Sequence, residues 1–420
     1  MAHVLDELAW RGLISQHTDL DALRAAMDAG PITYYCGFDP TAPSLHHGHL
    51  VQLLVLRHLQ RAGHRPIALV GGATGLIGDP RMSGERVLNT KETVAQWVER
   101  LREQVSRFLD FEGDDPALLV NNLDWTGELT AIDFLREVGK HYRLGTMLAK
   151  ETVARRLASE EGISFTEFSY QILQGYDFLE LFRRYGCVLQ TGGNDQWGNL
   201  LSGVELVRKA EQQTVHAMTT PLITKSDGTK FGKTEGGAVW LAPDMMTPYA
   251  FYQFWLNTDD ADVVRFLKIF TFRSREEIAE LEAAVQERPA AREAQRVLAE
   301  DVTTLVHGPE AVTSAVEASR ALFGRGALEQ LDTETLSAAV AELPRAEGRL
   351  GDPLVDLFAA SGIVGSKGEA RRAVADGGLY VNNVRVSDAE EQLASGHLMH
   401  GRWTLLRRGK RTLAVVDVKD

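Results

Sequence analysis

The chain has 420 residues, 25% of them charged, and a formal net charge of −13. The length predicts two or three domains, and the negative charge argues against broad, non-specific binding of nucleic acid, DNA included. No run of about 18 apolar residues predicts a membrane span, and the acidic N-terminal stretch lacks the pattern of a signal peptide. Two cysteines are too few for a disulfide framework or a Cys-based metal site and suit a reducing cytosol, so we expect a cytoplasmic protein.

Short apolar runs alternate with helical patterns in the first part of the chain. Four runs bounded by Gly or Pro are typical of buried strands and lie at 32–38, 65–74, 117–122 and 186–193. Helical patterns separate them. This alternation predicts a doubly wound, mostly parallel α/β sheet of the Rossmann-like type over residues 1–243.

The pattern changes after residue 243. Residues 244–342 show helical patterns alone, with Pro near the starts and Gly after the ends, and predict an all-α domain. Two Pro and two Gly at 343–353 predict a linker over 343–351. Residues 352–420 mix a helix with short strands and predict a small α+β domain.

Two histidines follow the first predicted strand, where a helix is expected to begin. His46 and His49 flank Gly48 in the stretch "SLHHGH". A helix start at the carboxyl end of a parallel strand suits phosphate, and a glycine lets a flat group such as a nucleobase approach the backbone. The alternatives are a tight turn with two solvated histidines, or a zinc site, for which His-x-x-His alone is weak.

A second stretch, residues 222–234 with the sequence "LITKSDGTKFGKT", is termed here the lysine loop. It places Lys225, Lys230 and Lys233 in a segment broken by glycines, which predicts a clamp for polyphosphate. It lacks the pattern of a Walker loop. The alternative is an exposed flexible loop.

A polar stripe occurs on the helix expected at 168–182. Tyr170, Gln174 and Asp177 are spaced i, i+4 and i+7 and so share one face. A solvated face would show the same spacing, although apolar residues on both sides disfavour full exposure. Beyond the fourth strand, Gly193 permits close approach of the backbone and Asp195 is placed to accept a ribose hydroxyl. A plain glycine-rich turn is the alternative there.

Together these motifs resemble the class I aminoacyl-tRNA synthetases, which carry a His-Ile-Gly-His and a Lys-Met-Ser-Lys-Ser signature. Here the two read "HHGH" and "KFGKT". The Phe-Gly form of the second resembles the bacterial tyrosyl branch, and the resemblance covers essentially the whole chain. One departure is His47, where an apolar residue is usual, and we expect this side chain to pack or to reach solvent.

The resemblance implies the roles of individual residues. The implied tyrosine-binding residues are Tyr35, Asp79, Tyr170, Gln174, Asp177, Gln190 and Gln196. The implied ATP-binding residues are Gly37, Asp39, His46, Gly48, His49, Gly193, Asp195, Lys230 and Lys233. The implied catalytic residues are Thr41, His46, His49, Lys230, Lys233 and Thr234. Within the pocket, Tyr35 and Asp177 would bond the substrate's phenol, and Tyr170, Gln174 and Asp79 its ammonium.

The stretch "GDPRMSGER" (78–86) departs from the family pattern. A lysine that helps to bind pyrophosphate is usual there, and this stretch is one residue shorter. Arg81 and Arg86 supply positive charge instead, and the sequence leaves open which of them takes the role.

The C-terminal segment resembles the RNA-binding fold of small ribosomal subunit protein four. Residues 352–420 hold ten Lys or Arg and nine Asp or Glu, a net charge of +1. The cations expected to contact RNA phosphates are Lys367, Arg371, Arg372, Arg407, Arg408, Lys410 and Arg411. A small structural domain with a solvated basic face is the alternative.

The resemblance implies that tyrosine and ATP form tyrosyl-adenylate and pyrophosphate, and that tRNA(Tyr) then receives the tyrosyl group. ATP is a substrate, Mg²⁺ arrives bound to its phosphates, and no resident metal is expected. The family forms homodimers, with an interface expected in a helical insertion at about 120–180. Two alternatives stay open: a tryptophanyl-type enzyme, and a non-catalytic RNA-binding protein on the same scaffold.

Overall fold

A computed structural model describes residues 3–81, 84, 87–113, 115–229, 231–234, 237–324, 326–341, 343–410 and 412–419. The chain divides into two compact units. The first contains Met1–Met245 and Asp259–Ala294, and the second contains Met246–Thr258 and Gln295–Asp420. None of the helices in these described ranges is long and apolar enough to cross a membrane.

The first unit is built on a five-stranded sheet of order β3-β2-β1-β4-β5, all of whose pairs are parallel. The strands are β1 (Thr33–Phe38), β2 (Arg65–Val70), β3 (Leu118–Asn121), β4 (Cys187–Gly193) and β5 (His216–Thr220). From β1 the chain adds β2 and then β3 on one side of the sheet, and it then returns to add β4 and β5 on the other side of β1. The order therefore reverses between β1 and β4, where open α/β sheets bind their ligands. The predicted doubly wound sheet is confirmed.

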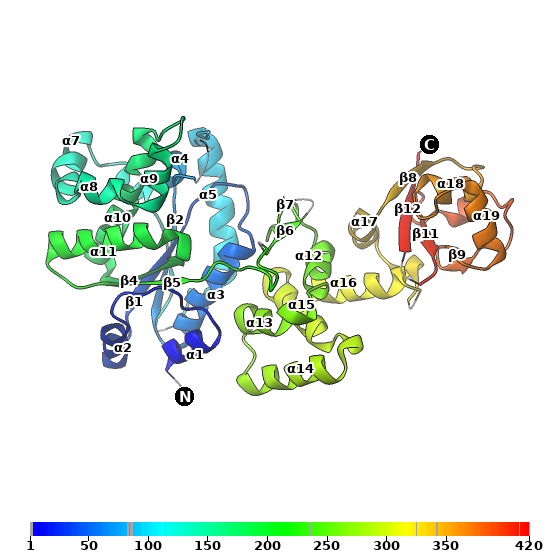
Figure 1. Ribbon diagram of the computed structural model, residues 1–420, viewed down its shortest axis with the longest axis horizontal. Coiled ribbons are helices and arrows are strands. Elements are labelled where there is room, and N and C mark those ends of the chain that lie inside the picture. The colour runs from blue at the N-terminus through cyan, green and yellow to red at the C-terminus, as the bar shows by residue number, and fades with distance from the viewer. Residues whose placement is uncertain are drawn as a thin grey trace. The chain divides into compact units, whose positions relative to one another are not determined.

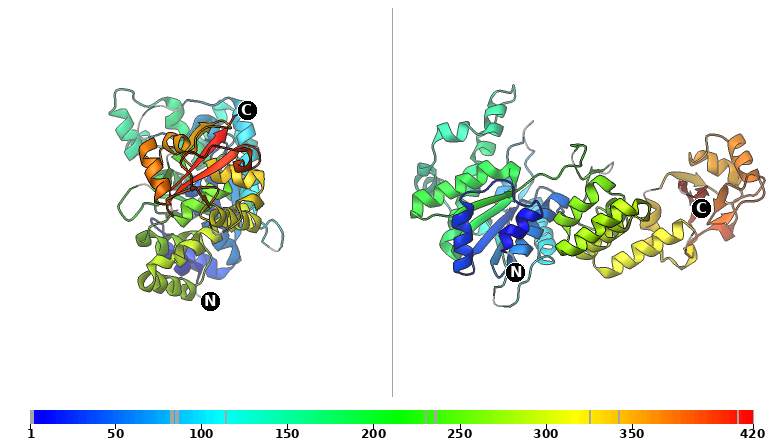
Figure 2. Two further views of the ribbon diagram at one scale, coloured as in Figure 1. Left: turned by 90° about the vertical axis from the view of Figure 1, so that its right-hand side faces the viewer. Right: turned by 60° about the horizontal axis from the view of Figure 1, so that its bottom comes forward.

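Helices cover both faces of this sheet (Figures 1 and 2). The larger ones are α3 (His47–Arg61), α5 (Lys91–Ser106), α10 (Phe165–Tyr185) and α11 (Trp197–Glu211). Shorter helices are α1 (Val4–Trp10), α2 (Leu20–Ala29), α4 (Thr74–Ile77), α6 (Leu123–Thr126), α7 (Ala131–Asp133), α8 (Leu144–Leu148) and α9 (Glu151–Leu157). Figure 1 shows α10 and α11 on one side and α3 and α5 on the other. The strands are nearly continuous apolar runs because both of their faces are buried.

Strand β5 falls outside the four strands predicted from sequence. Its residues "HAMTT" are all buried. An extended N-terminal segment bonds along its outer edge, with Thr219 donating to the Gln16 carbonyl at 2.7 Å and Thr18 donating to the Ala217 carbonyl at 3.0 Å. A tertiary contact therefore buries a strand in which three of the five residues are polar.

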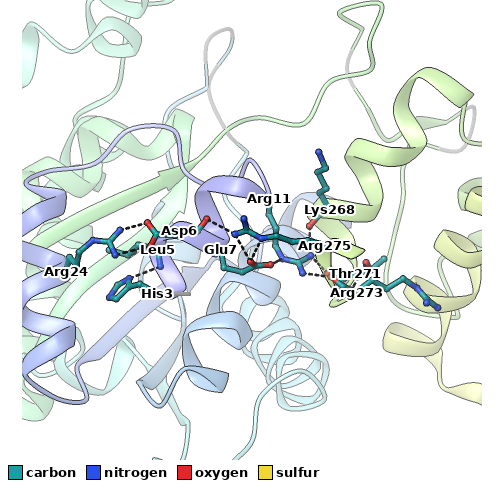
Figure 3. Close-up of polar contacts among 10 residues, drawn as sticks. All are labelled: His3, Leu5, Asp6, Glu7, Arg11, Arg24, Lys268, Thr271, Arg273 and Arg275. Atoms are coloured by element: carbon teal, nitrogen blue, oxygen red, sulfur yellow. Dashed lines mark hydrogen bonds and ion pairs between the residues drawn. The ribbon is translucent and has the colours of Figure 1, made fainter. Parts of the chain in front are cut away.

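Two further helices, α13 (Asp260–Phe270) and α14 (Arg275–Glu287), belong to the first unit. Figure 3 shows how Arg11, the C-cap of α1, holds the end of α13 and the connection to α14: it donates to the carbonyls of Lys268, Thr271 and Arg273 at 2.9, 2.7 and 2.7 Å. The carbonyls of Lys268 and Thr271 lie at the end of α13, where helical partners run out, and that of Arg273 lies in the connection to α14. The predicted boundary at residue 243 therefore does not coincide with the compact units, and the three-domain division stays a prediction.

The second unit contains helices and a second five-stranded sheet. Its helices are α12 (Pro248–Leu256), α15 (Glu293–His307), α16 (Pro309–Leu322), α17 (Thr333–Ala341), α18 (Leu354–Ala360) and α19 (Lys367–Ala375). Its sheet has the order β10-β9-β11-β12-β8. The strands are β8 (Arg345–Gly348), β9 (Leu379–Val381), β10 (Val384–Arg385), β11 (Trp403–Arg408) and β12 (Thr412–Val418). The predicted small α+β module is confirmed.

The linker predicted at 343–351 is wrong, because this segment contains β8. The strand pairs in parallel with β12, and Ala346 and Gly348 are buried. A Cβ on Gly348 would lie 2.6 Å from Val416 Cγ1, so only glycine fits at this approach. The Pro and Gly residues that suggested a linker flank or belong to an edge strand instead.

Candidate active site

The start of α3 is built by the two histidines of "HHGH". His46 is the N-cap, and its Nδ1 accepts a hydrogen bond of 3.1 Å from the Gly48 backbone N–H. His49 Nδ1 in turn accepts a 3.2 Å bond from the His46 N–H. This reciprocal capping satisfies donors that a helix start leaves unpaired. Because each Nδ1 accepts, the proton of each neutral ring is assigned to Nε2, which can donate to a ligand.

Gly48 is needed for this arrangement. A Cβ at this position would lie 2.9 Å from His46 Cε1, so a side chain would displace the ring. The rings of His46 and His49 lie 4.0 Å apart between centroids. Burial lowers the pKa of His46, and it lowers the pKa of His49 well below the usual value. The pair thus provides neutral N–H donors rather than cations at pH 7.

The histidines do not form part of a recognisable metal centre. In the described ranges, no group of three acid, histidine or cysteine side chains is arranged to hold a metal ion. Both Nδ1 atoms already accept backbone hydrogen bonds. The geometry therefore favours phosphate over zinc at this helix start.

The polar stripe on α10 faces the protein interior. The Tyr170 hydroxyl donates to Asp39 Oδ2 at 2.7 Å, and the Thr74 hydroxyl donates to Asp39 Oδ1 at 2.6 Å. Burial raises the pKa of Tyr170 well above its usual value, and the charges of Asp39 and Asp79 raise it further. The solvated alternative for the stripe is excluded at Tyr170 and Asp177, which are both buried.

Asp177 lies deeper on the same helix and is held by two donors. Asn122 Nδ2 donates to its Oδ2 and Trp125 Nε1 donates to its Oδ1, both at 2.9 Å. Asn122 also donates to the Thr74 hydroxyl at 2.9 Å. Burial raises the pKa of Asp177 to about 7, although these side-chain hydrogen bonds lower it. The carboxyl is therefore poised between its two protonation states near neutral pH.

Tyr35 Oη on β1, Gln174 Oε1 on α10 and Gln190 Oε1 on β4 are buried and have no hydrogen-bond partner among the described residues. Tyr35 is 1% exposed, packs edge-on against Phe178 at 5.3 Å, and has its pKa raised by burial and by the charge of Asp177. Buried polar atoms are almost always paired, so such a group of unpaired atoms indicates a polar ligand. The charge of Asp177 thus acts on Tyr35, the residue with which the resemblance pairs it.

A second carboxylate is held at the other end of the stripe. Asp79 accepts hydrogen bonds from Gln196 Nε2 at 2.8 Å and from Asn199 Nδ2 at 3.0 Å. Its charge acts on the buried Tyr170. Asp79 and Gln196, which the resemblance implies bind tyrosine, are therefore in direct contact, and a carboxylate at this end suits an ammonium group.

The ends of β1 and β4 contain the other predicted nucleotide-binding residues. The Asp195 carboxylate packs directly on the Gly193 backbone: a Cβ on Gly193 would lie 2.5 Å from Asp195 Oδ1. Gly37 lies exposed in β1, and the exposed Thr41 donates its backbone N–H to the Asp39 carbonyl at 2.8 Å. These residues lie at the edge where the strand order reverses.

The lysine loop is described in part. Lys233 and Thr234 form β6 (Lys233–Thr234), which pairs with β7 (Gly237–Ala238). The loop is anchored at its start by Asp262 of α13, whose Oδ1 accepts from the Ser226 N–H at 2.9 Å. Two predicted residues, Lys230 and Arg86, lie outside the described residues.

The 78–86 stretch is held by a buried arginine. Arg156 is 2% exposed, pairs with Glu167 at 2.9 Å, and donates to the carbonyls of Arg81 and Gly84 at 3.2 and 2.7 Å. The Arg81 side chain is exposed and can turn toward a phosphate from this fixed backbone.

Several of the cations predicted to bind RNA pair with nearby groups in the second unit. Lys367 pairs with Asp356 at 2.8 Å, and Arg371 with Glu390 at 3.4 Å. These pairs are exposed and weak, so phosphate can replace the acids.

The strand cations are held more closely. Arg408 pairs with Glu369 at 2.8 Å, and Arg407 lies over the Tyr380 ring at 3.9 Å. Arg372 and Lys410 are exposed, and Arg411 lies outside the described residues. The segment is therefore mixed in charge rather than a continuous basic patch.

Sequence reasoning missed the residues that hold the pocket. Thr74 donates to Asp39, Asn122 and Trp125 donate to the buried Asp177, and Asn199 donates to Asp79. Asn122 directly follows β3 at the edge that carries the site. That position was a usable signal for Asn122, whereas Trp125 on the short helix α6 offered none.

Comparison with known proteins identifies the class. Residues 27–324 match the family model of class I tRNA synthetases (W and Y), and residues 335–416 match the tyrosine–tRNA ligase SYY-like C-terminal domain. The chain therefore belongs to the class I tRNA synthetase family of the tryptophan and tyrosine enzymes.

Within this family, curated relatives identify the tyrosine enzyme. A tyrosine–tRNA ligase of Streptomyces avermitilis is 61% identical and one of Mycobacterium tuberculosis is 60% identical. The alignments cover 100% and 99% of this chain and 99% and 98% of the relatives. The activity is that of a tyrosine–tRNA ligase, which activates tyrosine with ATP and charges tRNA.

Solved structures agree. A C-terminally truncated mitochondrial tyrosyl-tRNA synthetase of Aspergillus nidulans has a TM-score of 0.70 at 30% identity, covering 77% of this chain and 95% of that chain. A tryptophanyl-tRNA synthetase of Encephalitozoon cuniculi, solved with tryptophan, has a TM-score of 0.54 at 14% identity, covering 79% and 89%. The second likeness shows the fold alone, and the tryptophanyl and non-catalytic alternatives find no support.

Proposed function

We propose that tyrosine binds along the buried stripe of α10. The observation that supports this most directly is the group of unpaired buried atoms on Tyr35, Gln174 and Gln190 beside the poised carboxyl of Asp177. A phenol donates to Asp177 and accepts from the Tyr35 hydroxyl, which phenylalanine cannot do. Leaving such groups unpaired is costly, and tyrosyl-tRNA synthetases are themselves the established example of this discrimination against phenylalanine.

At the opposite end of the substrate, the ammonium lies near Asp79 and Tyr170. Asp79 is held by Gln196 and Asn199, and Tyr170 is held by Asp39. Gln174 contributes its unpaired Oε1 as a further acceptor. The α-carboxylate then points toward the helix start of α3, where ATP is expected.

ATP is proposed to lie against His46, Gly48 and His49, with its ribose at Asp195. The Nε2–H groups of the neutral histidines donate to phosphate oxygens. The tyrosine carboxylate attacks the α-phosphorus, the bond to the bridging oxygen breaks, and pyrophosphate leaves. Positioning and charge neutralisation carry such displacements, and Thr41, Lys233 and Thr234 are proposed to supply them for the departing phosphates.

Mg²⁺ enters as part of the ATP substrate, bound mainly through phosphate oxygens. The tyrosyl-adenylate then yields its acyl group to the terminal ribose hydroxyl of tRNA(Tyr) and releases AMP. Because charged tRNA is used in translation, we propose that the protein acts in the cytoplasm.

A homodimer is proposed on the basis of exposed apolar side chains in the helical insertion. The exposed large apolar residues described between α6 and the start of α10 are Leu123, Ile132, Leu135, Leu144, Leu148, Leu157 and Phe165. Exposed apolar residues concentrated in one segment mark interaction sites. Equilibrium sedimentation of wild type and an Ile132→Glu/Leu144→Glu variant tests this, since a monomeric wild type would contradict it.

The decisive experiment for the proposed pocket is amino-acid-dependent ATP–pyrophosphate exchange across the twenty amino acids. Tyrosine alone should support rapid exchange, and Tyr35→Phe should reduce tyrosine selectivity over phenylalanine. If Tyr35→Phe kept the wild-type ratio of tyrosine to phenylalanine exchange, this hydroxyl would not belong to the pocket.

A further inference from the structure

The residue that departs from the family signature, His47, joins two segments that are far apart in the sequence. Its backbone N–H donates to the Val239 carbonyl at 2.9 Å, and Leu241 donates to the Leu45 carbonyl at 2.9 Å. His46 forms the bridge with Trp240 between them. The start of α3 is therefore paired with the chain that leaves the lysine loop.

The His47 side chain contacts the loop itself. Its ring stands at 90° to the Phe231 ring with 5.3 Å between centroids, an edge-to-face pair. Phe231 is 6% exposed and lies 4.3 Å from Phe266 and 6.1 Å from Phe270, both on α13. The phenyl ring is thus packed between the start of α3 and the helix that anchors the loop.

The same imidazole lies directly on the next residue of the loop. Gly232 has a φ of +80°, and a Cβ there would lie 1.9 Å from His47 Cε1 and 2.3 Å from Nε2. No side chain can occupy that space, so Gly232 is required both for its left-handed conformation and for the approach of the ring.

His47 is neutral in this environment. Burial, together with the charge of the neighbouring His46, lowers the pKa of His47 to about 4, and a backbone hydrogen bond with Phe231 opposes this shift. Its Nδ1 is buried and has no hydrogen-bond partner among the described residues. The neutral ring packs edge-to-face against Phe231, and this contact explains how histidine can take the place of the usual apolar residue.

We propose that His47 is a positioning residue for adenylate formation, which acts through Phe231 and Gly232 to hold the lysine loop against the start of α3. The inference rests on the proposed phosphate-binding role of that loop. His47 itself touches no reacting atom. It fixes the backbone that carries Lys233, and in displacements of this kind positioning supplies much of the rate.

The first test compares activation in wild type, His47→Ala, His47→Leu, Phe231→Leu and the His47→Ala/Phe231→Leu double variant. His47→Ala should slow single-turnover adenylate formation roughly 2- to 12-fold, the range expected for one aromatic pair. Equilibrium tyrosine binding should stay unchanged. His47→Leu, which keeps the apolar contact, should restore most of the rate. The double variant should be little slower than the slower single variant, because both remove one contact.

The second test uses trypsin, which cleaves after Lys225, Lys230 and Lys233, as a readout independent of activity. His47→Ala should be cut faster within residues 225–233 than wild type, and His47→Leu should not. His17→Ala, which removes an exposed imidazole far from the loop in sequence, is the matched control. Thermal unfolding of each variant shows whether the fold is retained.

The outcomes separate this inference from the proposed role of the loop. The inference alone would be overturned if Lys233→Ala slowed adenylate formation but His47→Ala did not. In that case His47→Ala would also be cleaved by trypsin at the wild-type rate. Wild-type activation by Lys233→Ala would overturn the role of the loop and the inference with it. Additive losses in the double variant would show that His47 does not act through Phe231.

Discussion

Trp125 Nε1 lies 2.9 Å from Asp177 Oδ1 and donates a hydrogen bond to it. The indole comes from the short helix α6, whereas the carboxylate comes from the middle of α10. With Asn122 on the other oxygen, two donors hold a buried acid whose charge acts on Tyr35. In the proposed tyrosine pocket, specificity would therefore depend in part on two side chains that the substrate is not expected to touch.

Asp177→Ala should weaken tyrosine use far more than phenylalanine use, because it removes the acceptor for the phenol. A hydrogen bond to a charged group contributes about 1.5–3 kcal/mol, or roughly 10- to 150-fold in selectivity. The measurement is kcat/KM for both amino acids in pyrophosphate exchange. Asp124→Ala, an exposed acid on α6, is the control. Equal losses for both substrates would place Asp177 outside the phenol site.

Tyrosine affinity should rise with pH through about 7. The pKa of Asp177 is raised to about 7 by burial, so below that value the carboxyl is protonated and cannot accept two donors and the phenol at once. Binding near pH 6.5 should release a proton, which calorimetry in buffers of different ionisation enthalpy detects. The pKa values of His46, His47 and His49 are lowered, so these rings stay neutral across this range. A flat affinity from pH 6 to 8 would contradict the assignment.

Trp125→Phe should move that pH midpoint upward. The variant keeps a ring in place but removes the N–H donor that lowers the pKa of Asp177. Tyrosine affinity should then fall at pH 7 and recover at pH 8, whereas a merely structural defect would not recover with pH. The same calorimetric titration, run on wild type and variant in parallel, distinguishes the two.

Lys233→Ala should slow adenylate formation strongly while tyrosine affinity changes little, because the contact matters mainly as charge develops on the departing phosphates. Single-turnover activation and equilibrium binding separate these effects. Lys91→Ala, which removes an exposed lysine at the start of α5, provides the comparison. If Lys233→Ala formed adenylate at the wild-type rate, the lysine loop would have no role in activation.

A protein ending at Leu343 should keep tyrosine-dependent pyrophosphate exchange and lose most tRNA charging. The cut precedes β8, so it removes the second sheet as a whole. It also removes the contacts of Asn383 with the Ala321 carbonyl at 2.7 Å and of His400 with the Leu331 carbonyl at 2.8 Å. Both freed carbonyls can be hydrated, so α16 and α17 should persist.

Charging by the intact protein should weaken steeply with salt, because cations of the C-terminal module displace counterions from tRNA. Tyrosine-dependent pyrophosphate exchange should depend much less on the salt concentration, because it does not involve tRNA. Full charging by the truncated protein would make the module structural, and loss of both activities would show that the module stabilises the preceding helices.

The local sequence pattern was enough to predict the strands and helices whose apolar residues repeat regularly. It was also enough to recognise the short motifs whose residues lie close together in the chain. The runs at β1, β2, β3 and β4 are apolar because both faces of a parallel sheet are buried, and that requirement is visible in composition. The histidine and lysine motifs are likewise short enough to recognise from their spacing. The roles of Tyr35 and Asp177 came only from resemblance.

Tertiary structure alone decided the rest. β5 is buried by an N-terminal segment that is distant in sequence. β8 is a strand because it forms hydrogen bonds with β12, and the proline- and glycine-rich sequence of this segment gives no sign of that pairing. The capping exchange between His46 and His49, the donors on Asp177 and the contact of His47 with Phe231 all join residues by geometry rather than by sequence distance. Periodicity reports which face of an element is buried, but not which side chain meets it there.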